Sequence, residues 1–422
     1  MPRQEVLILI RAGRLVDVVA GKVVKDQEIL VKGDRIVAVK SRAGAPEGTP
    51  IADLSMQTVL PGMIDCHAHL VGAEEEAGLP SIGQTAAQET LLGVRNARRT
   101  VIAGFTSVRD VGTYRAFLDI GLRDAIEAGW FPGPRMMTAG PYLTVTGGGG
   151  EITGLADGGP PPDEFRFGVA DSAVEVRHRA KAILDGGEDF LKIIATGAVL
   201  TRGTDPGKAE YTEEEIRAAV EVADERGSHV AAHAHGPAGI KNAVRAGVRS
   251  IEHGSLIDDE AIALMADRGT YLVADIYCGD YIAQEGRRTG WPEETLRKNE
   301  ETTEAQRRGF RKAVEAGVRV AFGTDSGVYP HGDNALQMEY MARHGLSPMG
   351  AIRSATLWAA ELMRRQEGVG SVTPGKYADL IAVAGDPLED LARLTELSFV
   401  MKGGEVLRGS DGGTVSEEVS SG

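Results

Sequence analysis

Short apolar runs recur through the middle of the chain, and each follows a glycine that ends a more polar, helix-like segment. Examples are GFTSVRDVG, GEDFLKIIATG, GSHVAAHAHG and GVRVAFGTDSG. A glycine just past a helix end supplies the left-handed conformation that closes the last turn, and a strand can start directly after it. Repeated helix–strand units of this kind predict an α/β protein with parallel strands joined by helical crossovers.

Seven such units, with an eighth strand in TVLPGMIDCHAHL, give eight predicted parallel strands. Eight parallel strands alternating with helices predict a (β/α)8 TIM barrel, which we place at residues 59–364. A Gly- and Pro-rich loop at residues 144–166 follows the third strand, and loops of that length on barrels are usually functional. The segment YTEEEIRAAVEVADERG predicts a helix that Thr212 caps, with Glu215 three residues further on.

The two ends of the chain have a different pattern, in which short strands are separated by Gly, Asp and Lys turns. The segment VLILIRAGRLVDVVAGKVVKDQEILVKGDRIVAV reads as antiparallel hairpins, and GKYADLIAVAG and LSFVMKGGEVLR near the other end have the same character. The β-rich ends are residues 1–58 and 365–409. Two β-rich ends around an α/β middle predict one small β-sandwich domain assembled from both termini. Residues 410–422 have little apolar surface to bury and are expected to be disordered.

Composition and charge narrow the classes of partner. The 422 residues include 46 Lys and Arg against 61 Asp and Glu, and the net charge of −15 argues against nucleic acid and anionic membranes. Two cysteines, Cys66 and Cys278, make no disulfide framework and favour a reducing compartment. The sequence shows neither a signal-peptide pattern nor an apolar stretch near the ~20 residues of a membrane span, so a cytoplasmic location is expected.

The positions of the histidines indicate a metal site. Five of the nine histidines lie at the C-terminal ends of predicted barrel strands: His67, His69, His233, His235 and His253. Barrel enzymes carry their chemistry on that face, and Asp325 closes the eighth strand there. In a strand, residues i and i+2 point to the same side, so each His-x-His pair presents two imidazoles together. Such donors favour Zn²⁺ or a similar ion.

Lys192 stands among apolar residues in DFLKIIATG, late in the fourth strand. A buried, unpaired ammonium is costly, and burial can lower a lysine pKa to about 5–6. One interpretation is that the side chain reaches solvent from the strand end, and the other is that it belongs to the metal site. The histidines at the same end of the predicted barrel favour the second interpretation.

Four other residues are assigned structural positions. Cys66 is expected to point away from the metals into the core, and Asp110 is expected to brace the barrel mouth. His178 and His229 lie in helical or helix-end context and are expected to be solvated.

Together these motifs resemble the amidohydrolase superfamily. PGMIDCHAHL resembles its first-strand metal motif, FLKIIATG the fourth-strand lysine of its binuclear members, and VAAHAHG, SIEHG and FGTDSG the remaining ligands. TPGKYADLIAVAGDPLED resembles the return of the chain into the small β-sandwich of these enzymes. The resemblance covers nearly the whole chain.

The resemblance implies a site for two divalent metal ions, expected to be zinc. His67 and His69 would bind the more buried ion together with Asp325. His233 and His253 would bind the more exposed ion. It also implies a small-molecule substrate and a homo-oligomer.

The same resemblance implies roles for three residues in catalysis. Lys192 would react with CO2 and bridge both ions as a carbamate, which is a carboxylate on a long stem. A hydroxide shared by the two metals would attack an amide carbonyl, and Asp325 would pass a proton from the attacking water to the leaving amine. His235, outside the implied ligand set, would donate a hydrogen bond to the substrate or the developing oxyanion, or else support a ligand.

Within the superfamily the chain most resembles the dipeptidase and N-acyl-amino-acid hydrolase branch, which includes prolidase-like and ochratoxin-hydrolysing enzymes. Imidazolonepropionase is similar in outline but lacks the bridging lysine. Two positions depart from the dipeptidase pattern, where they are associated with the substrate's free carboxylate. Gly149 stands in TGGGG where those enzymes often have histidine, and His235 stands where they often have tyrosine. Candidate substrate contacts follow the barrel strands: Tyr142, Arg202, Tyr277 and His331.

Three functions follow from these patterns. The first is hydrolysis of the C–N amide bond of an N-acyl amino acid or a dipeptide-like compound. The second is hydrolysis of a cyclic amide or lactone. The third is a non-catalytic metal-binding relative, and the complete ligand set, with Asp325, argues against it.

Overall fold

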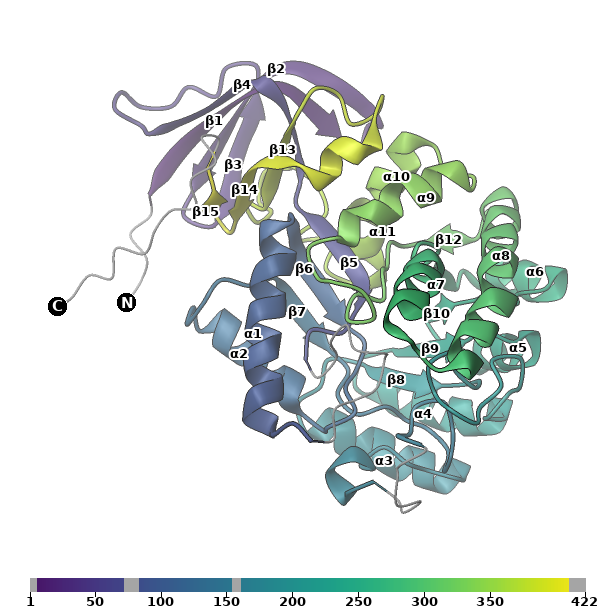
Figure 1. The fold of residues 1–422 in the computed structure, drawn as a ribbon. Helices are drawn as coiled ribbons and strands as arrows, with labels where there is room; N and C mark the ends of the chain where they lie inside the picture. Colours follow the sequence, from purple (N-terminus) through teal and green to yellow (C-terminus); the bar gives the residue numbers. More distant parts are fainter. Residues whose placement is uncertain (1–5, 72–82, 154–160, 410–422) are drawn as a thin grey trace.

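The computed structural model describes residues 6–71, 83–153 and 161–409, so the predicted disordered tail at 410–422 lies outside it (Figure 1). Strands from both ends of the chain form one seven-stranded sheet in the order β15-β14-β13-β4-β1-β2-β3. These strands are β1 (Leu7–Asp17), β2 (Lys22–Lys32), β3 (Arg35–Lys40), β4 (Ile51–Pro61), β13 (Leu380–Ala384), β14 (Leu397–Lys402) and β15 (Glu405–Arg408). Figure 1 shows the purple N-terminal and yellow C-terminal strands together at one end of the molecule.

The hairpin pattern accounts for most of this sheet but not for all of it. β2 pairs with β1 and with β3 in antiparallel fashion, and β13 pairs in the same way with β14 and β4. β1 and β4 run parallel, with Leu9 opposite Ile51. The segment at 41–50 carries the chain from β3 to the far side of β1, so this parallel pair lies outside the predicted hairpins.

The seven-stranded sheet curls around a core of its own. Backbone hydrogen bonds from Ile36 N to Lys376 O (2.9 Å) and from Ala378 N to Asp34 O (2.8 Å) join its edge strand β3 to the segment just before β13. The apolar side chains between them come from strands of both chain ends. The pairing is that of one curved sheet, so the two-layered β-sandwich and its predicted limits in the chain stay predictions.

Within the described residues, eight parallel strands follow one another along the chain and form two sheets, β5-β6-β7 and β12-β11-β10-β9-β8. Their bounds are β5 (Met63–Ala68), β6 (Phe105–Asp110), β7 (Arg135–Thr138), β8 (Leu191–Ile194), β9 (Val230–Ala234), β10 (Ser250–His253), β11 (Tyr271–Val273) and β12 (Arg319–Val320). Isolated parallel bridges join the two sheets at both edges, Ala68 to Ser326 and Leu143 to Ile193. The closed (β/α)8 barrel stays a prediction, which these two bridges support.

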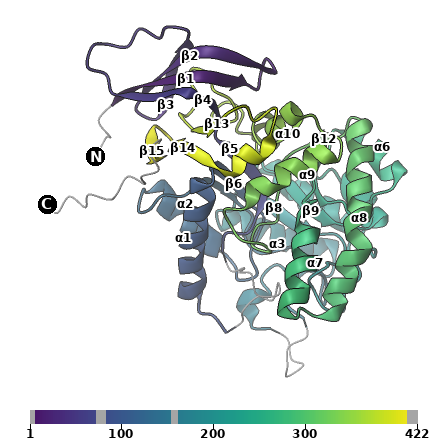
Figure 2. The same ribbon diagram turned by 45° about the horizontal axis from the view of Figure 1, so that its top comes forward.

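Helices alternate with the parallel strands and lie around their outside (Figures 1 and 2). The α-helices are α1 (Ala86–Ile102), α2 (Leu118–Glu127), α3 (Ala173–Asp185), α4 (Glu213–Glu225), α5 (Pro237–Ala246), α6 (Asp259–Arg268), α7 (Cys278–Thr289), α8 (Glu293–Glu315), α9 (Gln337–Arg343), α10 (Pro348–Ser354) and α11 (Leu357–Leu362). α4 begins as predicted, because Thr212 accepts a bond from Glu215 N and the Glu215 carboxylate accepts one from Thr212 N. In the part of the chain that the structure describes, no helix is both long and apolar enough to cross a membrane.

Most residues assigned to structural positions lie where the sequence predicts them. Cys66 is fully buried, His178 is exposed on α3, and buried Asp110 accepts backbone hydrogen bonds near the strand ends. His229 is a correction, because it is buried and its ring stacks on Phe190 with centroids 5.1 Å apart. The chain enters β9 at this residue, so the ring packs on the apolar cluster that includes Phe190 instead of facing solvent.

Candidate metal centre

Three donors from the first and last parallel strands meet at the C-terminal ends of those strands. His67 lies in β5 and His69 just after it, and strand alternation puts both imidazoles on one side. Asp325 follows β12 and its backbone N–H donates to His67 O (2.8 Å), which fixes the two segments together. The Nε2 atoms of His67 and His69 each lie 3.3 Å from Asp325 Oδ1. We name His67, His69 and Asp325 the first ligand group.

The imidazoles of the first ligand group have hydrogen-bond partners on their far sides. His67 Nδ1 lies 2.8 Å from Glu252 Oε2, and His69 Nδ1 lies 2.8 Å from Gly112 O. Glu252 in turn accepts a bond from Arg109 Nη2 (2.7 Å). A carboxylate or carbonyl at Nδ1 favours the tautomer that presents Nε2 to an ion, as in most metal-ligating histidines.

The ion pair between Arg109 and Glu252 is fully buried between the strands. Burial opposes ionisation of Glu252, but the neighbouring Arg109 and His67 hold the pKa of this carboxyl well below its usual range. Sequence reasoning missed the pair. Its signal is Arg109 in GFTSVRDVG and Glu252 in SIEHG, which are opposite charges inside two predicted strands, because buried charges need a partner of opposite sign.

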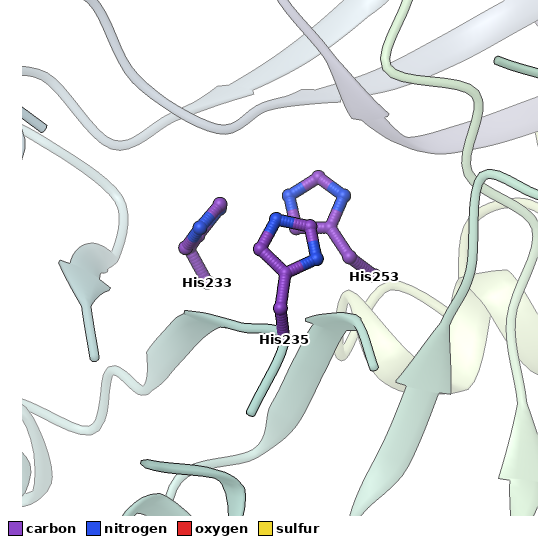
Figure 3. A group of neighbouring side chains, drawn as sticks. All are labelled: His233, His235 and His253. Atoms are coloured by element: carbon purple, nitrogen blue, oxygen red, sulfur yellow. The ribbon is translucent and has the colours of Figure 1, made fainter. Parts of the chain in front are cut away.

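Three imidazoles from β9, β10 and the residue after β9 form a second ligand group, His233, His235 and His253 (Figure 3). The ring centroid of His233 lies 4.6 Å from those of His235 and His253, which are 4.9 Å from each other. All three rings are less than one-tenth exposed and lie in the wall of the cavity that the first group also lines. The family resemblance implies His233 and His253 as ligands of the second ion and leaves His235 outside the ligand set. The structure brings all three together.

The two ligand groups are neighbours. The ring centroids of His67 and His253 are 4.8 Å apart, and Asp325 also forms a possible ligand cluster with His253 and Asp275. Burial raises the pKa of Asp325, but the imidazoles of His67 and His69 outweigh it and hold that pKa well below its usual range. Asp325 is therefore an ionised carboxylate at the junction of both groups.

Lys192 in β8 lies in the wall of the same cavity and is only 2% exposed. Burial lowers the pKa of its ammonium to about 8, although the carboxylates of Glu252 and Asp325 oppose the shift. A lower pKa raises the neutral fraction of the amine, which is the form that reacts with CO2. The position fits the expected carbamate bridge, and the carbamate itself stays a prediction.

A cavity of about 150 Å³ opens over both ligand groups. Apart from the ligands, its wall carries apolar and hydroxyl side chains, among them Tyr114, Tyr142, Phe165, Leu200, Thr201 and Ile282. Tyr142 was a predicted substrate contact, and its hydroxyl donates to Gly112 O (3.1 Å) beside His69. The wall thus combines apolar surface with hydroxyl groups close to the metal ligands.

The other three candidate substrate contacts lie outside the cavity wall that the described residues form. Arg202 is exposed to solvent. Tyr277 packs edge-on against Tyr329, with ring centroids 5.1 Å apart. His331 is buried, and both its ring nitrogens have partners, one of which is His69 O (3.0 Å). The geometry gives His331 a place behind His69, and substrate roles for these three residues stay predictions.

Two residues behind the second ligand group were not predicted. Asp275 follows β11, and its Oδ1 lies 3.0 Å from His253 Nδ1 and accepts a bond from Gln306 Nε2 (2.7 Å). Ser255 follows β10, and its Oγ lies 2.8 Å from His235 Nδ1. A signal for Asp275 exists in VADIY, where an apolar strand ends in aspartate as it does in FGTDSG.

Gly149, the glycine that departs from the dipeptidase pattern, is tightly enclosed. Its N–H donates to the Glu210 carboxylate (2.9 Å). A Cβ at this position would lie 2.9 Å from Thr196 O and 3.0 Å from Ala198 N, and these backbone atoms leave no room for it. The backbone of residues 196–198 therefore lies too close to Gly149 for a side chain at this position. Residues 154–160 of the same loop lie outside the described residues.

Comparisons with known proteins identify the family of this chain. The model of the Amidohydrolase family matches residues 58–410. Ochratoxinase from Aspergillus niger is 31% identical over 414 residues, covering 92% of this chain and 84% of that protein. A Xaa-Pro dipeptidase with bound methionine in the active site is similar with a TM-score of 0.90 at 36% identity, covering 96% of this chain and 100% of that one. A prolidase complexed with N-methylphosphonate-L-proline is similar with a TM-score of 0.89 at 30% identity and the same coverage. The chain belongs to the amidohydrolase family.

Proposed function

We propose that the chain is a metal-dependent hydrolase that cleaves the C–N amide bond of an N-acyl amino acid or a dipeptide-like substrate. The observation that carries this proposal is the meeting of two ligand groups and Lys192 in the wall of one cavity. The similarity to ochratoxinase and to a Xaa-Pro dipeptidase supports it. The bridges at both edges of the parallel sheets support a closed barrel as the scaffold.

The side chains present fit two divalent ions. The first ligand group offers two imidazoles and a carboxylate, the second offers imidazoles, and Lys192 lines the same cavity. Such nitrogen and oxygen donors suit zinc or a similar transition metal. When bound, the ions supply Lewis-acid activation of water and of the amide carbonyl.

Asp325 is the residue that we propose to move the proton. It is ionised, because the neighbouring imidazoles hold its pKa well below its usual range despite its burial. It contacts both imidazoles of the first ligand group and lies within reach of His253 in the second. A carboxylate at that junction can accept the proton of the attacking water and deliver it to the leaving nitrogen.

The cavity wall suits the acyl part of such a substrate. Phe165, Leu200 and Ile282 offer apolar surface, and the hydroxyls of Tyr114 and Tyr142 offer hydrogen bonds near the ligands. A pocket with mostly apolar walls and a few polar groups is typical of small-molecule sites. We therefore expect an acyl group with an apolar or aromatic body.

A hydrolysis panel on metal-reconstituted protein tests the proposal, with N-acyl amino acids, Xaa-Pro and other dipeptides, and lactones as substrates. We expect amine release from the first two classes, abolished by a chelator and restored by added metal. Asp325→Asn protein, purified and reconstituted in parallel, gives the background rate. Hydrolysis of lactones alone, or amine release that a chelator leaves unchanged, would contradict the proposed function.

A further inference from the structure

A second cavity lies at the other end of the parallel strands from the metal centre. It has a volume of about 180 Å³ and is bordered by His229, Arg249 and Thr270, which come directly before β9, β10 and β11. The metal ligands lie where strands of the same sheet end, and no described residue lines both cavities. A single water molecule needs about 10–15 Å³ of such volume, so a small ion or molecule has room.

The wall of this second cavity is positively charged, and we name it the arginine cavity. The described residues that line it include Arg249, Arg268 and Arg364 and one carboxylate, that of Asp224. Three guanidinium groups against one carboxylate leave an excess of two positive charges, in a chain whose net charge is −15. Burial lowers the pKa of Arg249, and the like charge of Arg364 lowers it further. The two guanidinium groups therefore repel each other, and an anion beside them would offset this repulsion.

The hydrogen bonds of Arg249 and Arg364 leave donors for a ligand. Arg249 donates from Nε to Leu362 O (2.6 Å) and from Nη2 to Glu361 O (2.5 Å), and Arg364 donates from Nη1 to Gly227 O (2.8 Å). These bonds hold both side chains in place. Among the described residues neither guanidinium forms an ion pair, and none accepts a bond from Arg249 Nη1 or from Arg364 Nη2. Because a guanidinium has five N–H donors, each keeps N–H groups for an acceptor in the cavity.

The backbone at Arg364 indicates a use for its side chain. This residue lies two positions after α11 with a φ of 55°, in the left-handed region. Arg365 N donates to Ala360 O (2.8 Å), which closes a helix end where glycine is usual, because side chains are disfavoured in that conformation. Other residues in this region are held there by the surrounding packing and cluster at functional sites. Arginine in place of glycine puts a guanidinium at the cavity in spite of this strain.

We propose that the arginine cavity binds a phosphate group, as inorganic phosphate or as part of a phosphate monoester. A phosphate dianion would balance the two excess positive charges, and guanidinium groups bind phosphate through paired N–H donors. The Thr270 hydroxyl and the His229 imidazole add polar groups to the wall. The bound phosphate would lie at the start of β9 and β10, the strands that carry His233 and His253. The site is separate from the metal centre, so the proposal does not rest on the hydrolytic function.

Calorimetric titration of metal-free, full-length protein with inorganic phosphate tests the proposal, at low ionic strength and mildly alkaline pH. We expect saturable binding by the natural chain. Arg364→Asn should weaken phosphate binding roughly 10–100-fold through loss of a charge-assisted contact. Asparagine tolerates the left-handed backbone of this position, so the variant should fold. Arg268→Gln should weaken binding about two- to fivefold, because the charge that it removes is exposed.

Two further variants sharpen the test. Asp224→Asn removes the carboxylate from the wall and should tighten phosphate binding about two- to fivefold, a gain that a purely structural role of the arginines does not predict. Arg288→Gln is the matched control, because Arg288 lies in the last turn of α7 as Arg268 does in α6. It should bind phosphate as the natural chain does. Thermal unfolding of each variant establishes that it is folded.

Methyl phosphate distinguishes the two sources of the ligand. A site for monoesters binds it more tightly than inorganic phosphate, a site for the free ion binds it more weakly, and either result supports the proposal. The proposal is overturned if the natural chain binds neither compound, or if folded Arg364→Asn and Arg268→Gln bind phosphate as tightly as Arg288→Gln. The metal ligands are the same in all these proteins, so phosphate held at the metal centre would give equal affinities and the second of these outcomes.

Discussion

The two ligand groups lie side by side, yet they are held in different ways. The first contains a carboxylate and rests on the fully buried ion pair of Arg109 and Glu252. The second consists of imidazoles, positioned by Ser255 and Asp275, which follow the ends of neighbouring strands. A buried pair of opposite charges supports the first group, whereas one carboxylate, one hydroxyl and one backbone carbonyl support the second.

Because of this difference, the two groups differ in charge when no metal ion is bound. Asp325 is an anion beside its two imidazoles, so the first group is electrostatically satisfied before any metal binds. The second group has no anion among its three donors.

Both groups share a backbone feature, because His253 and Asp325 have φ values of 67° and 60°. That region is uncommon for non-glycine residues, so the surrounding packing places these two donors.

Asp325→Asn removes the anion of the first group and should have the largest effect on activity. The change is nearly isosteric, and asparagine tolerates the left-handed backbone of this position, so the fold should persist. Loss of the proton acceptor should lower kcat by about 10²–10⁴-fold. The measurement is amine release by metal-reconstituted protein with its zinc content determined in parallel. Near-normal turnover in a fully metallated variant would refute the assignment of Asp325.

Lys192→Ala removes the proposed connection between the groups. The apolar side chains around the parallel strands are untouched, so the protein should fold. Activity should fall on the order of 10²–10³-fold, as for loss of one transition-state electrostatic contact. A carbamate acts as a carboxylate held in place, so propionate or acetate in the vacated space should restore part of the rate. Lys192→Glu should restore part of the rate in the same way, because its own side chain supplies a carboxylate. An unmodified Lys192 by mass spectrometry, in fully active enzyme, would show that no carbamate is needed.

Glu252→Gln tests the charge network behind the first group. It leaves the buried guanidinium of Arg109 without its carboxylate, which should lower the free energy of unfolding by about 3–5 kcal/mol. Urea unfolding of metal-free protein at neutral pH measures this change. The matched control is Glu221→Gln, which breaks an exposed pair with Arg177 and should cost less than about 1 kcal/mol.

The same carboxylate predicts a pH dependence with a definite sign. The pKa of Glu252 is lower in the folded protein than in the unfolded chain, because Arg109 and His67 outweigh its burial. Its stabilisation is therefore complete above the unfolded value of about 4.3 and is lost as the pH falls toward the folded value. The natural chain should lose stability in acid below about pH 4.3 more steeply than Glu252→Gln. Parallel acid profiles for the two proteins would contradict the ionised pair.

The gathering of the candidate ligands could be predicted from the sequence because the geometry of a strand is local. The i, i+2 spacing that unites His67 with His69 follows from the period of a strand. Glycines after helices likewise mark where strands begin, so the parallel α/β class follows from local pattern. For the same reason the helix at Thr212 was predictable from its cap.

The contacts that the sequence did not predict depend on how strands far apart in the chain are aligned with each other. Glu252 meets His67 across 185 positions of sequence, and no local pattern states which strand residues face each other. The parallel pairing of β1 with β4 has the same cause, because hairpin signals do not say on which edge the chain returns. His229 was misplaced because it precedes β9, and its surroundings come from Phe190 on another strand.

Asp275→Asn is the mildest change, and it asks whether a single far-side contact sets the strength of the second group. Asparagine keeps the shape and can still accept the bond of His253 Nδ1, but it removes the charge that makes this imidazole a better donor to an ion. The second zinc ion should bind roughly 10–100-fold more weakly, and the first should bind as before. Stepwise calorimetric titration of metal-free protein separates the two ions. Asp259→Asn, an exposed change at the start of α6, is the matched control. Equal weakening of both ions would show that the two groups act as one, because a local effect on His253 leaves the buried network around His67 untouched.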